Sequence, residues 1–297
     1  MRGLAQAVTS GLLIGAVYGL IALGLNIVFG TMRVVNFAQG TLLMAGMFMT
    51  YWLWELGGVH PYISPLVTAP LLFGLGFAVQ HLFVSPLLAR ERAREPMSVL
   101  LLTLGLALVL ENVALLFFSA DFKTVTTDVS MQTFKIAGLI VSVPRLVGLG
   151  AMVATSLVLY LFFMHTDLGR AVRATGQDRE VARLMGINDF RIYGVAYGLS
   201  AAMMGIAAAV LVPFFYIHPG VGTSFLLKAF VIVVLGGLGS MKGSLIGALA
   251  IGYIEAITVF ALPSGAYLKG AVALAIMVAV LLVRPEGLFG VAFEEER

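Results

Sequence analysis

The stretch GLLIGAVYGLIALGLNIVFG, residues 11–30, decides the fold of this chain. It lies within a run from Gly3 to Met32 that carries no charged residue. An α-helix needs about 20 apolar residues to cross the bilayer core, so the run predicts a membrane span near residues 8–29. The run is too long for the apolar part of a signal peptide, and no small-residue cleavage site follows it. We therefore expect it to stay in the protein as a span.

The rest of the sequence has the same character. Of its 297 residues, 60% are hydrophobic and 11% are charged, whereas a soluble domain carries roughly 25% charged residues. This composition excludes a soluble enzyme, a nucleic-acid-binding domain and a disordered protein. It predicts an integral membrane protein whose surface contacts membrane lipid. The net charge of +3 comes from loops between apolar runs and is no sign of nucleic-acid binding.

Nine apolar runs are candidates for spanning helices. They are residues 8–29, 37–54, 66–89, 97–118, 146–165, 191–212, 225–238, 244–260 and 269–283. The runs are continuously apolar rather than alternating, which favours helices over a β-barrel. Two of them, 225–238 and 269–283, are short, and glycine-rich interruptions are typical of broken helices. The prediction is an all-α, polytopic bundle of eight to ten transmembrane helices, in one domain that covers residues 1–297.

Arginine-rich loops predict the orientation. Residues 90–95 (RERARE) carry three arginines, and residues 166–191 carry five. Cytoplasmic loops are enriched in Lys and Arg, so both loops should face the cytoplasm. Counting spans places the N-terminus outside, although one re-entrant segment would place it inside. The polar stretch of about residues 119–145 then lies outside. Within it, TVTTDVS (124–130) favours β structure; the stretch is either an ordinary loop or a docking surface.

The loop of about residues 167–190 predicts a short helix outside the membrane. Asp178 is a typical N-cap, and Gly186 is a typical stop after a helix. Between them Val181, Leu184 and Met185 fall at helical spacing on one face. The prediction is a helix of about two turns on the cytoplasmic side. It is either a solvated linker or a surface on which another protein docks.

Two interruptions between apolar runs point to a pathway. They are MRVVNFAQG (32–40) and GGLGSMKGS (236–244). Non-helical backbone at membrane depth survives only where it is buried in protein or lines a water-filled path. Corresponding breaks in the two halves of a transporter are a pointer to its binding site. Both segments can equally be short cytoplasmic turns.

Two acids, Glu111 and Glu255, lie inside apolar runs. A charged side chain at the centre of a span costs about 2.5–3.5 kcal/mol on insertion scales, and it usually faces the bundle interior. One hypothesis makes these acids substrate contacts or gating groups. The other makes them structural ion pairs, with Lys228 as a candidate partner.

Catalytic and cofactor signatures are missing from the sequence. It has no cysteine, its four histidines are scattered, and no G-x-x-x-x-G-K-[ST] loop occurs. H-E-x-x-H and G-x-S-x-G motifs are also absent. We therefore expect no enzymatic activity, no catalytic residue, no metal site and no cofactor in this chain.

Three segments resemble a known family. They are GLLIGAVYGLIALGLNIVFGTMRVVNFAQGTLLMAG (11–46), RAVRATGQDREVARLMGIN (170–188) and VIVVLGGLGSMKGSLIGALAIG (231–252). They are similar, in matching order, to the permeases of branched-chain amino acid ABC importers, most of all to the shorter, LivH-type permease. The resemblance covers nearly the whole chain. It implies a single permease domain in the cell (inner) membrane that forms half of a translocation path.

The resemblance also implies partners and site residues. The partners are a second, LivM-type permease, two cytoplasmic ATP-binding subunits and a periplasmic or extracellular substrate-binding protein. Residues 170–188 correspond to the coupling helix, with contacts to the ATP-binding subunits expected at Gln177, Asp178, Arg179, Val181, Ala182, Leu184 and Met185. Candidates for lining the path are Asn36, Gln39, Thr41, Glu111 and Glu255.

The substrate is not fixed by the resemblance. Such permeases carry branched-chain amino acids, and close relatives carry urea, short amides or aromatic acids. The alternative function is an ion-coupled secondary transporter, in which Glu111 and Glu255 form the ion site.

Overall fold

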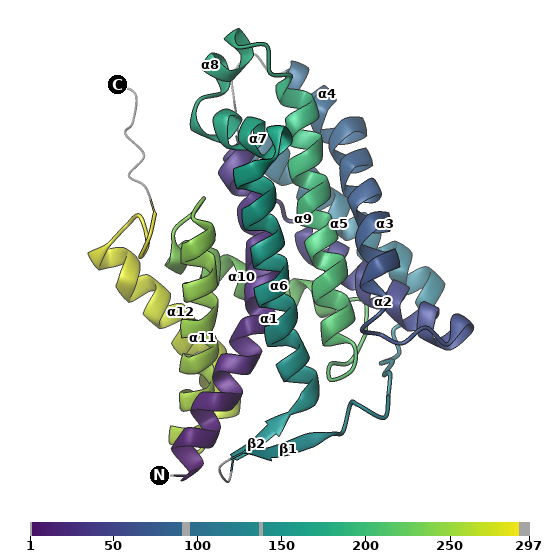
Figure 1. Ribbon diagram of the computed structural model, residues 1–297, viewed down its shortest axis with the longest axis vertical. Coiled ribbons are helices and arrows are strands. Elements are labelled where there is room, and N and C mark those ends of the chain that lie inside the picture. Colours follow the sequence, from purple (N-terminus) through teal and green to yellow (C-terminus); the bar gives the residue numbers. More distant parts are fainter. Residues whose placement is uncertain (1, 91–95, 137–138, 291–297) are drawn as a thin grey trace.

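The computed structural model describes residues 2–90, 96–136 and 139–290. It forms an upright bundle of helices with a β-hairpin at one end and two short helices at the other (Figure 1). The predicted all-α class is therefore confirmed. Residues 91–95 of the RERARE segment and the last seven residues of the charged tail, 291–297, lie outside the described residues.

All nine predicted runs are helical. The helices are α1 (Arg2–Met32), α2 (Gln39–Gly57), α3 (Pro65–Val79) with its continuation through the π-helix η1 (Gln80–Val84) into α4 (Ser85–Arg90), α5 (Pro96–Phe118), α6 (Val143–His165), α9 (Asp189–Leu211), α10 (Val221–Gly236), α11 (Met241–Ala261) and α12 (Gly265–Val283). In the described part of the chain, seven spans are long and apolar enough to cross a membrane. They are all of these except α2 and α10, so the chain is a polytopic helical membrane protein.

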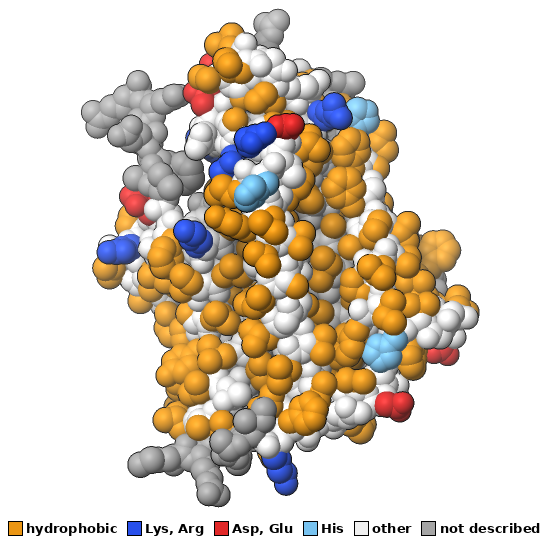
Figure 2. Space-filling view, viewed as in Figure 1, with side chains coloured by type: hydrophobic (Ala, Val, Ile, Leu, Met, Phe, Trp, Pro, Cys, Tyr) orange, Lys and Arg blue, Asp and Glu red, His pale blue; other side chains and the backbone are white. Residues whose placement is uncertain are grey.

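Two helices form the centre of the bundle. α1 and α9 are mostly buried, and α1 packs mainly against α11 and α9 while α3 covers another side of α9. In contrast, α5, α6 and α12 are mostly exposed. Figure 2 shows apolar side chains over the middle of the visible face, with charged side chains near its two ends. This distribution is that of a protein whose middle lies in lipid.

Glycine permits the closest contact, between α1 and α11. A Cβ atom on Gly252 of α11 would lie 2.5 Å from the Cα atom of Gly15. Gly11 meets the same segment of α11 one turn earlier. Small residues at such positions let two helix backbones touch, which is the main source of packing energy between helices in lipid.

Both predicted interruptions are real breaks. The first separates α1 from α2 at residues 33–38, and the second separates α10 from α11 at Gly237 and Gly239, whose φ angles are 105° and 85°. The second break lies against α1, because the Gly239 N–H donates to Oδ1 of Asn26 at 2.7 Å. The first turns of α2 and α10 then cross at Gly40 and Gly222, whose backbones are in contact. These two helices therefore start inside the bundle rather than at its ends.

The hairpin end of the bundle carries β1 (Thr133–Ile136) and β2 (Leu139–Ser142), which pair antiparallel. Residues 124–130, where the sequence favours β structure, are described and form no strand. Gln6 of α1 anchors β2, since its Nε2 donates to the Ile140 carbonyl (2.6 Å) and its Oε1 accepts from the Ile140 N–H (2.8 Å). The N-terminus lies at this end (Figure 1).

The opposite end carries two short helices, α7 (Asp167–Gln177) and α8 (Arg179–Leu184). Of these two helices, the sequence predicts only α8. α7 has its own signal, because the hydroxyl of Thr166 caps it by accepting from the Gly169 N–H at 3.0 Å. The prediction of a single helix in this loop was therefore incomplete.

Candidate functional site

α8 stands apart from the spanning helices (Figure 1). Its start is as predicted, since a carboxylate oxygen of Asp178 accepts from the N–H groups of Glu180 (2.8 Å) and Val181 (3.0 Å). Its end is also as predicted, because Gly186 adopts a φ angle of 84°, which glycine tolerates best. The helix itself has six residues, somewhat less than two turns.

One face of α8 is apolar and open. Val181, Leu184 and Met185 are 54%, 86% and 78% exposed, and we call these three residues the α8 patch. Ala182, between them in the sequence, is buried. Exposed apolar residues grouped in this way mark an interaction surface more often than a solvated linker.

A buried carboxylate fixes α8 to α9. Oδ2 of Asp189 accepts from Nε of Arg179 at 2.6 Å and lies 2.7 Å from Nη2 of Arg183. The Arg179 guanidinium also lies 5.2 Å from the centre of the Tyr193 ring. Arg179 is thus largely engaged within the chain. Sequence reasoning missed Asp189, although it directly follows Asn188, the residue that caps α9.

α7 connects the same unit to α1. Gly176 packs against the backbone of Gly30, and the Gln177 carbonyl accepts from Nη2 of Arg33 at 3.3 Å. Together with the Asp189 contact, this joins α7 and α8 to the two most buried helices. α7 and α8 are therefore attached to the centre of the bundle at two points.

Three candidate path residues lie in the interior instead of on an open surface. Asn36, Gln39 and Thr41 are each at most 4% exposed. Nδ2 of Asn36 donates to Oε1 of Gln39 (3.3 Å), and Nε2 of Gln39 donates to the Ser200 carbonyl of α9 (3.3 Å). The hydroxyl of Ser200 lies 2.6 Å from the Gly24 carbonyl of α1. These bonds brace the first break against α1 and α9.

Glu255 forms an ion pair in the interior. Its Oε1 accepts from Nζ of Lys228 at 2.7 Å, and its Oε2 accepts from the hydroxyl of Tyr18 at 3.0 Å. Nζ of Lys228 also donates to the Tyr18 oxygen at 2.7 Å. The pair links α11, α10 and α1, with the Glu255 side chain 6% exposed. The hypothesis that Lys228 is the partner of Glu255 is confirmed.

Glu111 is placed differently. It lies on α5 and is partly exposed, and one of its carboxylate oxygens is 3.6 Å from the point that a Cβ atom on Gly220 would occupy. The ring of His218 lies equally close to that point. Among the described residues, none donates a hydrogen bond to Glu111 or forms an ion pair with it. Glu111 and Glu255 look alike in the sequence, but they have different surroundings: Glu255 is paired in the interior, and Glu111 has no such partner among the described residues.

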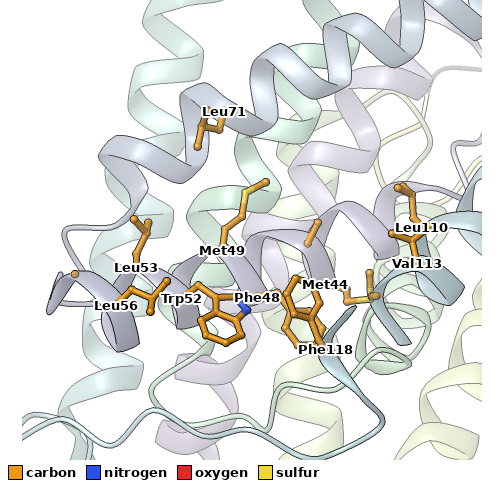
Figure 3. A pocket seen from close by; sticks show the side chains of 13 residues that line it. Met44, Phe48, Met49, Trp52, Leu53, Leu56, Leu71, Leu110, Val113 and Phe118 are labelled. Carbon is orange, nitrogen blue, oxygen red and sulfur yellow. The ribbon is translucent and has the colours of Figure 1, made fainter. Parts of the chain in front are cut away.

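An apolar cavity of about 560 Å³ opens between α2, α3 and α5 (Figure 3). Met44, Phe48 and Trp52 of α2 and Leu110 and Phe118 of α5 line it, and all five are labelled in the figure. The rings of Phe48 and Phe118 stack with their centroids 4.5 Å apart. Its side chains offer a single polar atom, the indole nitrogen of Trp52. The cavity therefore has little with which to hold a polar solute.

These features define a multi-pass membrane protein of the transport class, with polar groups inside its spans and a structured segment beyond them. The family described as "Branched-chain amino acid transport system / permease component" matches residues 7–281. The chain belongs to this family. The match does not support the alternative of an ion-coupled secondary transporter.

Individual relatives are similar over most of their length. The chain is 29% identical to the high-affinity branched-chain amino acid transport system permease protein BraD of Pseudomonas aeruginosa, covering 96% of this chain and 95% of that one. It is 29% identical to the corresponding LivH protein of Salmonella typhimurium, with the same coverage. It is 30% identical to a probable LivH permease of Methanocaldococcus jannaschii, covering 93% and 89%. A solved structure of PsaBC from Streptococcus pneumoniae aligns with a TM-score of 0.49 at 15% identity, covering 96% and 93%.

Proposed function

We propose that this chain is one of two permease subunits of an ATP-driven importer for branched-chain amino acids. A second related permease, two cytoplasmic ATP-binding subunits and a periplasmic or extracellular binding protein complete the assembly. The names of its relatives support the substrate. The observation that carries the coupling role is the α8 patch, an exposed apolar surface fixed to α9 outside the bundle.

In this proposal α8 is the coupling helix and lies on the cytoplasmic side. The α8 patch enters a groove of an ATP-binding subunit, with Gln177 and Asp178 at its edge. ATP binding draws the two ATP-binding subunits together and moves α8. The Asp189 contact passes that movement to α9, and α9 passes it to the helices packed on it. Since ATP is hydrolysed on the partner subunits, this chain needs no catalytic residue.

The translocation path runs between this chain and the second permease. The largely exposed apolar helices α5 and α12 support such an arrangement, because they offer surface for another membrane subunit to cover. The N-terminus, at the end opposite α8, then lies outside. Of the five predicted path residues, Glu111 is the candidate that stays in this proposal, because it is partly exposed on α5, whereas Asn36, Gln39, Thr41 and Glu255 are buried and brace the interior.

Leu184→Asp tests the coupling helix. A charge in the α8 patch should prevent seating in an apolar groove, so the ATP-binding subunits should no longer co-purify with the tagged chain and uptake should be lost. Met131→Asp is the matched control, because Met131 is 83% exposed but lies near the hairpin end. Asp178→Arg should uncouple the system in the same way. Full recovery of ATP-binding subunits with both α8 variants would overturn the assignment.

A cross-link gives an independent test. The chain contains no cysteine, so Gln177→Cys introduces a single thiol at the exposed end of α7. It should cross-link to an ATP-binding subunit carrying a thiol at the edge of its groove. Thr126→Cys, exposed near the hairpin end, should not. The same variants report sidedness, because reagent confined to the cytoplasm should label only Gln177→Cys.

A further inference from the structure

α10 has one open face that is mostly polar. Thr223, Ser224 and Leu227 are exposed, and the Lys228 side chain is 27% exposed. We call these four residues the open α10 face. Ser224 and Lys228 follow Gly220 at intervals of four residues, so they lie in one row along the helix. The other sides of α10 pack on α1, α2 and α11. Polar side chains inside a span usually face a water-filled path and avoid lipid.

Glu111 stands at the head of this row. Its carboxylate lies beside Gly220, the residue just before α10, and α5 carries it there from the neighbouring side. An acid within an apolar span usually faces the bundle interior or a water-filled path. No described residue forms an ion pair with Glu111, and the ring of His218, which lies near the same point, forms no hydrogen bond with it. The position of Glu111 at the edge of an open polar surface leaves room for a charge from outside the chain.

Lys228 is not available to bind a solute. An ammonium group has three N–H donors. Those of Lys228 are directed at Tyr18 (2.7 Å) and at the two oxygens of Glu255 (2.7 and 3.0 Å). Among the described residues near this face, the carboxylate of Glu111 has no ion-pair partner, and the hydroxyls of Thr223 and Ser224 have no hydrogen-bond partner. The ring of His218 lies close to Gly220 as well.

We infer that the open α10 face lines the translocation path and that Glu111 holds the ammonium group of an amino acid substrate. This inference rests on the proposed function and identifies a substrate contact, which the proposed function does not specify. The hydroxyls of Thr223 and Ser224 donate hydrogen bonds to the substrate carboxylate, because Glu111 repels that group. A solute without a cationic amine, such as urea, a short amide or a simple carboxylic acid, gains nothing from Glu111.

Uptake of leucine by the complete transporter, reconstituted with all its subunits, tests the contact. Glu111→Gln should lower the uptake rate by about tenfold or more, which is the loss expected for one charge-assisted hydrogen bond. Glu111→Asp should retain part of the activity. Glu55→Gln, which alters an exposed acid at the end of α2, should leave uptake unchanged. Stimulation of ATP hydrolysis by the binding protein should persist in all three variants.

The outcomes separate the inference from the proposed function. No leucine uptake by the wild-type transporter would overturn the proposed function and the inference with it. Wild-type uptake in the Glu111→Gln variant would overturn the inference alone.

Thiol accessibility tests the path without changing Glu111. Ser224→Cys should react with a small water-soluble thiol reagent in the assembled transporter, and the rate should change when ATP is added. Val158→Cys is the matched control, because Val158 is 63% exposed on the apolar surface of α6, a helix that the proposal does not assign to the second permease. Equal reaction rates at the two positions would remove the open α10 face from the path.

Discussion

Glu255 and Glu111 are both glutamates within long apolar helices, yet their surroundings differ. Glu255 sits between three helices with a lysine and a tyrosine bonded to its carboxylate. Glu111 faces the edge of an open polar surface, and the described residues leave it without a hydrogen-bond donor. The first arrangement is complete within the chain. The second leaves the carboxylate accessible to another molecule, which is what distinguishes an acid available for binding from a structural one.

Among the variants that test this comparison, Glu255→Ala should cause the largest loss of stability. Removal of one partner from a buried ion pair leaves the other charge uncompensated, and the expected loss is about 3–5 kcal/mol of unfolding free energy. Denaturant titration of the purified chain in detergent measures it. The Lys228 ammonium, 27% exposed, is the group left without its counter-charge. A loss below about 1 kcal/mol would show that the pair contributes little to stability.

Tyr18→Phe should have the next largest effect. It removes the hydroxyl that donates to Glu255 and accepts from Lys228, while the ring and its contact with the lysine stay. The expected loss is about 1–3 kcal/mol, because two buried charged groups each lose one hydrogen bond. The same titration measures the change. Tyr253→Phe, which alters an exposed tyrosine on α11, should leave stability unchanged.

A smaller effect is expected when both charges are removed together. The double variant Lys228→Met, Glu255→Leu should unfold within about 1 kcal/mol of wild type, since apolar replacement of a buried ion pair is often neutral or stabilising. The double variant should therefore be more stable than Glu255→Ala alone. Equal instability in the two would mean that packing, and not charge, dominates at this site.

The smallest effect on stability is expected at Glu111, the other side of the comparison. Glu111→Gln should change the unfolding free energy by less than about 0.5 kcal/mol, because the described residues form no bond that it would break. Uptake should fall nonetheless. A stability loss as large as that of Glu255→Ala would make Glu111 a structural acid, and the contrast between the two regions would vanish.

Much of this fold follows from local sequence. A continuously apolar run of sufficient length is helical in lipid whatever its neighbours are, so all nine runs were found. The short helix α8 was also predictable, because Asp178 and Gly186 define its limits through bonds within a few residues. The polar groups were harder to place. Asn36 and Gln39 look like path residues in the sequence, but both are buried, and the Ser200 carbonyl that accepts from Gln39 lies more than 150 residues away in the chain.

The pairing of Glu255 with Lys228 lies between these cases. Lys228 and Glu255 are on helices that follow one another in the chain, so the sequence could suggest Lys228 as the partner. Nothing local reveals that Tyr18 completes the group, or that Glu111 lies beside Gly220 of a distant segment. Asp189 was missed for a similar reason, because Arg179 and Arg183 reach its carboxylate only when α8 folds back onto α9.

The contact between α1 and α11 has a consequence for how the protein is made. α1 precedes the other described helices in the chain, but its principal partner begins at Met241, after residues 33–240 have been synthesised. Its second large partner, α9, is also late. During synthesis the glycine face of α1 therefore stays without its partner until α11 has been made, and the centre of the bundle closes only after that. Contacts between such distant segments form slowly, so closure of the centre depends on the arrival of α9 and α11 rather than on α1 alone.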